Sequence, residues 1–340
     1  MSGPLLTIVI PTYNRAENLE LLLRVLQAEL SGLEDAVQVL VSDNASTDRT
    51  PELTRDVQAG WPALRVQRHA QNLGPEENFC SGVERVDSRY FWIIGDDDLP
   101  KRGVVAHLIA LLREHAPALV YMQSEWVSPI TSPDQGESIG TLSVEMLDAF
   151  KFARRVHVWV TYISGVIVDR TVLIRALGEH KIRRFTNTSL VQLGWILPVL
   201  ATNERFAFVT DRCILATKDN SGGYPVLTVF GVRFARIVHE ALGRHSRIGR
   251  VLIGGNIAHY LPGLMWGARL APCGHHDAED TWLEMRQHLG DRSLFWLLLV
   301  PLGRFPRWLA QPFYQSWRVV SRLYRELQRL RDGAASRAFL

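Results

Sequence analysis

Three consecutive aspartates, Asp96, Asp97 and Asp98, follow an apolar run that ends at residue 94. Like charges within about 4–6 Å raise one another's pKa unless a cation lies between them. Oxygen-only ligands at this density suit Mg²⁺ or Mn²⁺, and Mg²⁺ commonly combines one or two carboxylates with substrate phosphates. The triplet therefore predicts a metal site for a phosphorylated substrate. The alternative is an acidic turn that precedes the helix after Pro100.

Three other polar segments each follow a strand-like run. They are 11–15, the segment SDNASTD at 42–48, and NLGPEENF at 72–79. Asp43 in the second segment is a candidate ligand-binding carboxylate. Its alternative role is turn and capping chemistry, because Asp, Asn, Ser and Thr all favour turns and helix starts.

The elements that must position these segments alternate along the first half of the chain. Apolar runs predict strands at 5–10, 37–41, 64–68, 90–94 and 118–123, and helical spacing predicts helices at 16–30, 78–85 and 104–114. This alternation implies an α/β fold with an open, mostly parallel sheet and helices on both faces. Ligands bind beyond the carboxyl ends of the strands in such sheets. We therefore expect 11–15, 42–48 and 95–98 to gather at one edge.

Four segments in this order resemble the family 2 glycosyltransferases. They are IVIPTYNR at 8–15, VSDNASTDRT at 41–50, NLGPEENF at 72–79 and FWIIGDDDLP at 91–100. The resemblance covers about the first 125 residues and is greatest to the subset that includes abequosyltransferases. It implies the GT-A nucleotide-diphospho-sugar transferase fold, which has an open, Rossmann-like sheet, here with a helical C-terminal extension.

The resemblance also implies roles for individual residues. Pro11, Tyr13 and Arg15 would border the nucleotide, and Asp43 would accept a hydrogen bond from the base. The aspartate triplet would hold Mn²⁺ or Mg²⁺ on the donor diphosphate, with either Asp96 and Asp98 or Asp97 and Asp98 as the principal pair. The donor-binding residues expected in this way are Pro11, Tyr13, Arg15, Asp43, Asn72, Gly74, Asn78, Asp96 and Asp97, and the metal ligands are Asp96, Asp97 and Asp98.

A catalytic base is harder to place. An inverting transfer needs a base within about 3 Å of the acceptor hydroxyl, usually Asp or Glu. Many relatives have an acidic pair at a helix start further along the chain, but here that neighbourhood reads NTSLVQLGW at 187–195, and Gln192 cannot act as a base. Glu125 after the fifth predicted strand is a candidate. The base stays unassigned, and so does the choice between inversion and retention.

The C-terminal segment is basic and aromatic. Residues 301–340 contain eight Arg against Glu326 and Asp332, a local charge of +6, so the first 300 residues carry −3 of the total of +3. The interleaved aromatic and basic residues are Trp296, Phe305, Trp308, Phe313, Tyr314, Trp317 and Tyr324 with Arg304, Arg307, Arg318, Arg322, Arg325 and Arg329. This mixture favours a helix at an anionic membrane surface. The alternative is a basic helix whose aromatic side packs on the catalytic domain.

Composition limits the remaining possibilities. The 340 residues allow about two domains at roughly 100–200 residues each, and 47% apolar against 21% charged residues is a globular balance. With 38 basic and 35 acidic side chains, nothing indicates a nucleic-acid partner. The longest apolar run, 294–302, is shorter than the roughly 20 residues of a membrane span. Three widely separated cysteines and no signal-peptide pattern favour a cytoplasmic protein. Together with the basic and aromatic C-terminal segment, this predicts a peripheral position on the inner face of the cell membrane.

These observations lead to one expected function and two alternatives. We expect a metal-dependent glycosyltransferase with its donor half at 1–125, its acceptor half at 126–228 and a helical, membrane-associating region at 229–340. The expected acceptor is a glycan on a polyprenyl diphosphate, in bacterial surface polysaccharide (O-antigen) assembly. A nucleotidyltransferase of related fold is one alternative, although no Gly-rich loop with Lys or Arg follows the first strand. A non-catalytic membrane-associated scaffold is the other, and the missing acidic pair near Gln192 favours it.

Overall fold

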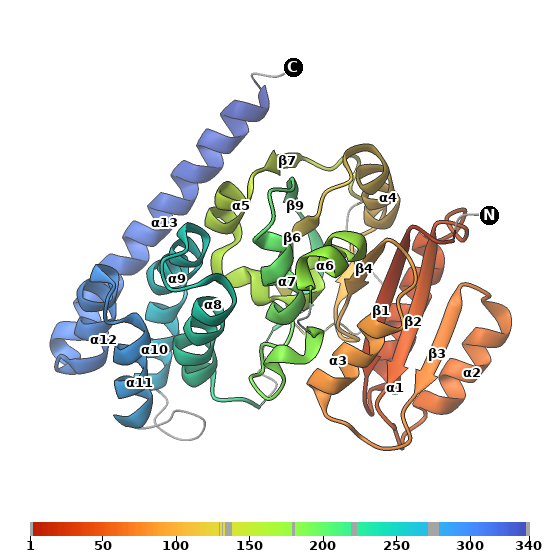
Figure 1. Cartoon of the computed structure of the whole chain (residues 1–340), viewed down its shortest axis with the longest axis horizontal. Helices are drawn as coiled ribbons and strands as arrows, with labels where there is room; N and C mark the ends of the chain where they lie inside the picture. The colour runs from red at the N-terminus through yellow and green to blue at the C-terminus, as the bar shows by residue number, and fades with distance from the viewer. Residues whose placement is uncertain are drawn as a thin grey trace. The chain divides into compact units, whose positions relative to one another are not determined.

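The computed structural model describes residues 3–128, 130, 132, 138–178, 181–218, 223–270 and 279–337. The chain divides into two compact units. Unit 1 comprises 1–222 and 237–249, and unit 2 comprises 223–236 and 250–340. The sheet belongs to unit 1, and the described part of unit 2 is helical (Figure 1).

Within the described residues, nine strands form one sheet in unit 1. They are β1 (Leu6–Thr12), β2 (Val37–Asp43), β3 (Leu64–Arg68), β4 (Tyr90–Ile93), β5 (Leu99–Pro100), β6 (Leu119–Val127), β7 (Val144–Leu147), β8 (Val166–Asp169) and β9 (Phe206–Thr217). Their order is β3-β2-β1-β4-β8-β6-β9-β5, with β7 paired to β9. Strands β1 to β4 are parallel, as are β6 and β9, whereas β8 runs antiparallel to both neighbours.

The mostly parallel α/β sheet confirms the predicted fold class, and the five predicted strands correspond to β1, β2, β3, β4 and β6. Sequence patterns missed β8, which separates β4 from β6. Its four residues lead directly into the helix that begins at Arg170, so no Gly or Pro marks the end of the strand. The expected boundary at residue 125 falls inside β6, so 1–125 and 126–228 share one sheet.

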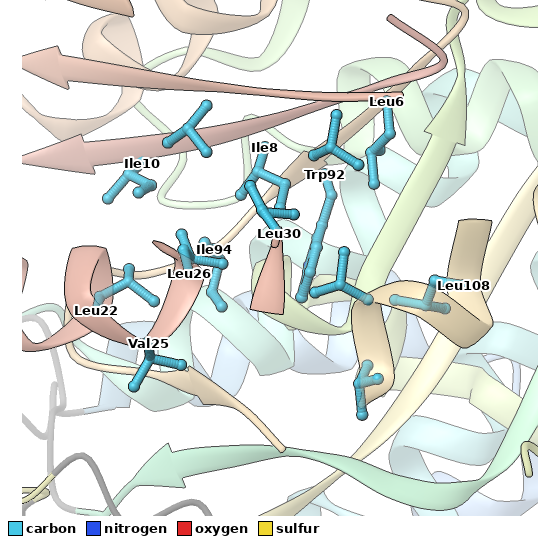
Figure 2. Packing of buried hydrophobic residues seen from close by; sticks show 14 of the residues in the cluster. Leu6, Ile8, Ile10, Leu22, Val25, Leu26, Leu30, Trp92, Ile94 and Leu108 are labelled. Atoms are coloured by element: carbon cyan, nitrogen blue, oxygen red, sulfur yellow. The ribbon is translucent and has the colours of Figure 1, made fainter. Parts of the chain in front are cut away.

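Helices cover both faces of this sheet. Those of unit 1 are α1 (Ala16–Glu29), α2 (Thr50–Gly60), α3 (Pro75–Glu84), α4 (Val104–His115), α5 (Ala149–Val156), α6 (Arg170–Leu177) and α7 (Leu193–Leu200), with single-turn segments η1 (His157–Thr161), η2 (Ile163–Gly165) and η3 (Ile182–Phe185). Leu22 and Leu26 of α1 and Leu108 of α4 pack on one face against β1 and Trp92 of β4 (Figure 2).

Helix α3 lies on the opposite face. Its Gly82 permits a close approach, because a Cβ there would lie 2.6 Å from Cγ1 of Val9 in β1. The missing side chain therefore sets how near α3 sits to the strands that carry the polar loops.

The described part of unit 2 is made of helical segments. They are η4 (Thr228–Arg233), α8 (Phe234–Leu242), α9 (Arg247–His259), α10 (Leu261–Leu270), α11 (Glu279–Leu289), η5 (Phe295–Leu299), α12 (Val300–Arg304) and α13 (Arg307–Arg337), of which α8 and α9 extend across the boundaries with unit 1. The helical C-terminal region is thus confirmed. Among the described residues, no helix has the length and apolarity to cross a bilayer.

A carboxylate on α1 caps the N-terminus of α4. Gly103, at a left-handed φ of +82°, donates its backbone N–H to Oε1 and Oε2 of Glu29 at 2.9 and 3.0 Å. Val105 N lies 3.5 Å from the same Oε2. Because a helix start leaves N–H groups without intrahelical partners, Glu29 both satisfies them and opposes the helix dipole.

Replacing Glu29 tests this cap. Glu29→Ala should lower the free energy of unfolding by about 1–2 kcal/mol, because the α4 N–H groups lose their acceptor. Glu29→Gln keeps one oxygen and should lose less. Urea unfolding measures both changes. Equal stability of Glu29→Ala and the wild type would mean that water replaces the cap without cost.

Candidate active site

Strand register brings the predicted polar loops to one edge. Parallel pairing puts Thr12 opposite Asp43, and Val9 opposite Ile93 of β4, two residues before Gly95. The segments that leave β1, β2 and β4 at this carboxyl edge are therefore adjacent, as expected for an open α/β sheet.

Hydrogen bonds fasten the first two loops together. Asn14 donates its backbone N–H to Ser46 Oγ at 2.9 Å, and Thr47 N donates to Asn14 Oδ1 at 2.7 Å. Ala16 N donates to Asp48 Oδ2 at 3.0 Å. Sequence analysis missed these roles, because Asn, Ser and Asp in a loop give no sign of which partner they have. The loops form a fixed rim on which Tyr13 remains 42% exposed, while Pro11 is buried at its base.

Asp43 is almost completely buried. Its Oδ1 accepts a hydrogen bond from Ser46 N at 2.9 Å. Its Oδ2 lies 3.2 Å from Nε of Arg68 in an ion pair but accepts no well-aligned hydrogen bond. Oδ2 therefore keeps accepting capacity. Because this oxygen is buried, a nucleotide base reaches it only if a neighbouring side chain moves, and the half-exposed Arg68 contacts it directly.

The predicted loop at 72–79 is held by amide groups, one of which comes from Asn44. Asn72 Oδ1 accepts hydrogen bonds at 2.8 Å from Asn44 Nδ2 and from Gly74 N. Gly74 adopts a φ of +83°, which disfavours any side chain. Asn78 is buried and exchanges hydrogen bonds with Ser42, whose Oγ donates to Oδ1 at 2.6 Å. The donor contacts expected of Asn72, Gly74 and Asn78 stay predictions, and all three shape the loop.

Asp96 faces the first loop. Its Oδ2 accepts a hydrogen bond from Thr12 Oγ1 at 2.8 Å, and its Oδ1 accepts one from Arg15 Nη1 at 3.0 Å. The same Arg15 nitrogen lies 3.3 Å from Asp97 Oδ2. The structure thus joins Arg15, as predicted for this edge, to two members of the triplet.

Asp98 faces residues far along the chain. Its Oδ2 accepts a hydrogen bond from the Tyr162 hydroxyl at 2.8 Å, and its Oδ1 accepts one from Thr217 N at 3.2 Å. Thr217 Oγ1 also donates to the Asp97 carbonyl at 2.8 Å. Sequence analysis missed Tyr162 and Thr217. Neither residue belongs to a motif, and only the positions of β8 and β9 bring them here.

Burial raises the pKa of both inner carboxyl groups. Removal from water raises the pKa of Asp96 to about 6, against the opposing effects of Arg15 and the Thr12 hydroxyl. Removal from water likewise raises the pKa of Asp98 to about 6. Asp97 is the most exposed member of the triplet.

The oxygens around Gly95 fit a hard divalent cation. A Cβ on Gly95 would lie 3.0 Å from Asp97 Oδ1, 3.5 Å from Asp98 Oδ2 and 3.6 Å from Ser164 Oγ. We call this the Gly95 cradle. Two carboxylates completed by substrate phosphates are a common set for Mg²⁺ or Mn²⁺. Among the described residues no three acidic, His or Cys side chains converge as a metal cluster. The cradle favours the pair Asp97 and Asp98, because Asp96 bonds through its two oxygens to Thr12 and Arg15 and has none near Gly95 among the closest atoms.

The candidate base Glu125 has a basic partner. Its Oε2 accepts a hydrogen bond from Lys101 Nζ at 2.6 Å, and this bond lowers the pKa of Glu125. Side chains alternate along β6, so Glu125 points to the face opposite Ser124 and Trp126. Gln192 donates from Nε2 to the Thr161 carbonyl at 2.7 Å. The assignment of Glu125 stays a prediction.

Comparison with known proteins bears directly on this edge. Residues 7–168, which contain all three predicted loops and the Gly95 cradle, match the model of the family described as glycosyl transferase family 2. The match spans 162 of the 340 residues. The match confirms the family resemblance drawn from the four sequence segments.

Two curated relatives match shorter stretches of the chain. Abequosyltransferase RfbV of Salmonella typhimurium is 37% identical over 115 residues, which are 33% of this chain and 34% of RfbV. Validoxylamine A glucosyltransferase of Streptomyces hygroscopicus is 50% identical over 52 residues, which are 15% of this chain and 12% of that protein. The chain therefore spans about a third or less of the curated relatives it matches. The predicted resemblance to abequosyltransferases is confirmed.

Solved structures extend the likeness beyond residues 7–168. Residues 1–349 of S. aureus TarS in complex with UDP superpose with a TM-score of 0.60 at 16% identity, over 96% of this chain and 92% of that fragment. The mannosyltransferase PcManGT of Pyrobaculum calidifontis, solved with GDP-Man and Mn²⁺, gives 0.53 at 14% identity, over 95% and 88%. At these identities the likeness shows the fold, and it confirms the predicted GT-A architecture with its helical C-terminal region.

The raised pKa of Asp96 predicts how stability depends on pH in protein free of divalent ions. An unfolded Asp titrates near 3.9 and the folded Asp96 near 6, so the stabilising effect of its proton is complete below about pH 4 and lost as pH rises through 6. Asp96→Asn can keep contacts with Thr12 and Arg15 without the buried charge. It should be more stable than the wild type by roughly 1–3 kcal/mol at pH 8, with no such advantage at pH 4.

Urea unfolding at pH 4 and pH 8 in EDTA measures this difference. Asp87→Asn, an exposed change in the same unit, serves as the control and should not shift between the two pH values in the same way. If the difference in free energy of unfolding between Asp96→Asn and the wild type were the same at pH 4 and pH 8, Asp96 would already be ionised at low pH.

Proposed function

We propose that the chain is a glycosyltransferase that moves a sugar from a nucleotide-diphosphate donor to a glycan acceptor. One observation carries the proposal: within the segment that matches family 2, Asp43 ends β2 and the Gly95 cradle follows β4, and these two strands flank β1 at one edge of the sheet. That spacing suits a base at Asp43 and a diphosphate at the cradle. The named activities of RfbV and of validoxylamine A glucosyltransferase support sugar transfer.

The residues at this edge of the sheet have different proposed roles. Asp97 and Asp98 would hold Mn²⁺ or Mg²⁺, which when bound neutralises the charge that develops on the leaving nucleoside diphosphate. Arg15, 42% exposed and already beside Asp96 and Asp97, offers guanidinium N–H groups to the same phosphates. Tyr162 and Thr217 hold Asp98 in place through its two oxygens. Preorganised charges of this kind stabilise a transition state without rearranging during the reaction.

The acceptor we propose is a lipid-linked glycan, on a polyprenyl diphosphate, in assembly of a bacterial surface polysaccharide such as O-antigen. The likeness to an abequosyltransferase supports this choice of pathway. Helix α13 supports the proposal that the acceptor is linked to a lipid, because the helix has two separate apolar faces and only one of them packs within unit 2.

The inner face of α13 packs within unit 2. Ala310 is fully buried, and the Tyr314 ring stacks on Trp266 with ring centroids 5.0 Å apart. Trp317 donates from Nε1 to the Ala258 carbonyl at 2.9 Å. These aromatics therefore belong to the packing of unit 2.

The outer face of α13 is apolar and exposed. Trp308, Val319, Val320 and Leu323 are 72%, 59%, 64% and 53% exposed. At 100° per residue these side chains occupy one arc of the helix, and the exposed residues Arg307, Arg318 and Arg322 lie beside that arc. Apolar residues bordered by basic ones suit a helix lying on anionic lipid. We therefore propose peripheral attachment to the cytoplasmic face of the cell membrane through this arc.

A panel of nucleotide sugars tests the proposed activity. UDP-, GDP-, CDP- and dTDP-sugars are each added with Mn²⁺ or with EDTA, and thermal unfolding and donor hydrolysis are followed. One nucleotide class should stabilise the wild type, by about 2.7 kcal/mol at 100 times its Kd. Asp97→Asn should lose the Mn²⁺-dependent part of this shift, and Asp43→Asn should weaken nucleotide binding with or without metal.

Asp87→Asn is the matched control, since Asp87 is an exposed aspartate of unit 1 away from the edge. It should bind and hydrolyse the donor as the wild type does. Absence of any stabilising nucleotide sugar would contradict the proposed activity. Unchanged Mn²⁺ dependence in Asp97→Asn would contradict the cradle alone.

The outer face of α13 gives a separate prediction. Trp308→Gln combined with Val319→Gln and Val320→Gln should lower partitioning onto anionic phosphatidylglycerol vesicles by roughly ten-fold or more, because apolar burial contributes about 25 cal/mol per Å². These side chains are exposed, so the melting temperature should not fall. Vesicle sedimentation at low and high salt measures the partitioning.

Ile174→Gln, at a 54% exposed position on α6, is the control and should sediment like the wild type. Phosphatidylcholine vesicles should bind the wild type less well, because they lack the anionic charge that attracts Arg307, Arg318 and Arg322. Equal sedimentation of the triple variant and the wild type would remove α13 as the attachment site.

A further inference from the structure

Three aromatic side chains cluster beside the Gly95 cradle. The ring of Trp126, near the end of β6, lies 5.3 Å from that of Tyr162 and 6.1 Å from that of Trp159, centroid to centroid. We call these residues the aromatic triad. Trp126 is 42% exposed, whereas β6 residues 119–122 are buried. An indole so open to water adds little to the core.

The triad is joined directly to the cradle. The Tyr162 hydroxyl donates to Asp98 Oδ2 at 2.8 Å, and that oxygen is one of those that face Gly95. A donor diphosphate at the cradle would have its sugar next to this point. An acceptor must approach the anomeric carbon from outside the diphosphate, so a surface that begins one hydrogen bond from the cradle is well placed to hold it.

The framework beneath the triad is rigid. Gln192 holds the Thr161 carbonyl, and Tyr162 N donates to the Trp159 carbonyl at 2.9 Å. Gly165 makes room for the Tyr162 ring, because a Cβ there would lie 2.8 Å from Tyr162 Cδ1. A site that is already ordered loses little conformational entropy when a ligand binds. Gln192 is thus a positioning residue for the triad.

We propose that Trp126 is the stacking platform for a pyranose ring of the acceptor glycan, with Trp159 and Tyr162 as its support. This inference rests on the proposed glycosyl transfer. A pyranose presents an apolar C–H face, which an indole can cover while the sugar hydroxyls stay in water. The triad carries no formal charge, so it favours a neutral sugar ring over a charged group. Trp126 binds the acceptor and takes no part in the chemical step.

The test measures binding of simple glycosides apart from catalysis. Methyl α-mannoside, methyl α-galactoside, methyl α-rhamnoside and methyl N-acetyl-β-glucosaminide are probes for saturation-transfer NMR with the full chain in the presence of UDP or GDP. At least one should receive saturation through its ring C–H protons. Trp126→Ala should reduce that signal roughly three- to ten-fold, the range of one aromatic contact. Trp126→Phe should retain most of it.

Ile174→Ala, which removes an exposed apolar side chain elsewhere in unit 1, should leave the signal unchanged. Donor binding is measured on the same samples and should be equal in all four proteins. Where a glycoside also serves as an acceptor, Trp126→Ala should raise its KM and leave kcat within about two-fold. The proposed role of Trp126 would be wrong if no glycoside gave a signal with the wild type, or if Trp126→Ala gave the same signal as the wild type; the proposed sugar transfer would be unaffected as long as the donor is bound and hydrolysed. If instead no nucleotide sugar bound but a glycoside signal depended on Trp126, the proposed sugar transfer would be wrong and the glycan-binding role of Trp126 would remain.

Discussion

Two buried carboxylates after β4 set the constraint on which the rest of the site depends. Removing Asp96 and Asp98 from water disfavours their charged forms, so the surrounding structure must supply donors for their oxygens. The donors come from separate parts of unit 1: Thr12 at the end of β1, Arg15 shortly after it, Tyr162 after η1, and Thr217 at the end of β9. Each of these segments is thereby fixed relative to the triplet.

The antiparallel strand β8 makes this arrangement possible. It enters the sheet between β4 and β6, so the residues just before it lie beside the loop after β4. Ser164 shows the result: its carbonyl accepts from Trp92 Nε1 at 2.7 Å and its Oγ accepts from Gly95 N at 2.9 Å. The same segment carries Tyr162, so the strand that completes the sheet also brings the aromatic triad to the cradle.

This dependence on β8 explains what could be predicted from sequence. The strands β1 to β4 and the polar loops after them are local patterns, and the predicted edge contains Arg15, Asp43 and the triplet as expected. The partners of Asp98 lie 64 and 119 residues further along the chain, and no local pattern reports such a contact. From sequence, either Asp96 and Asp98 or Asp97 and Asp98 could be the principal pair. In the structure, both oxygens of Asp96 accept hydrogen bonds, from Thr12 and Arg15, while an oxygen of Asp97 and one of Asp98 face Gly95.

Helix α13 shows a second limit of composition. Its aromatic and basic content supported both a membrane helix and a packed helix, and the structure shows packing for one side of it. Tyr314 and Trp317 pack inside unit 2, whereas Trp308 is 72% exposed. Burial of the inner side stabilises the fold, while the exposed side gains nothing from folding. Apolar side chains that folding leaves exposed are stabilised only when a binding partner removes them from water. The Arg residues beside this arc are the reason that we propose an anionic lipid surface as that partner.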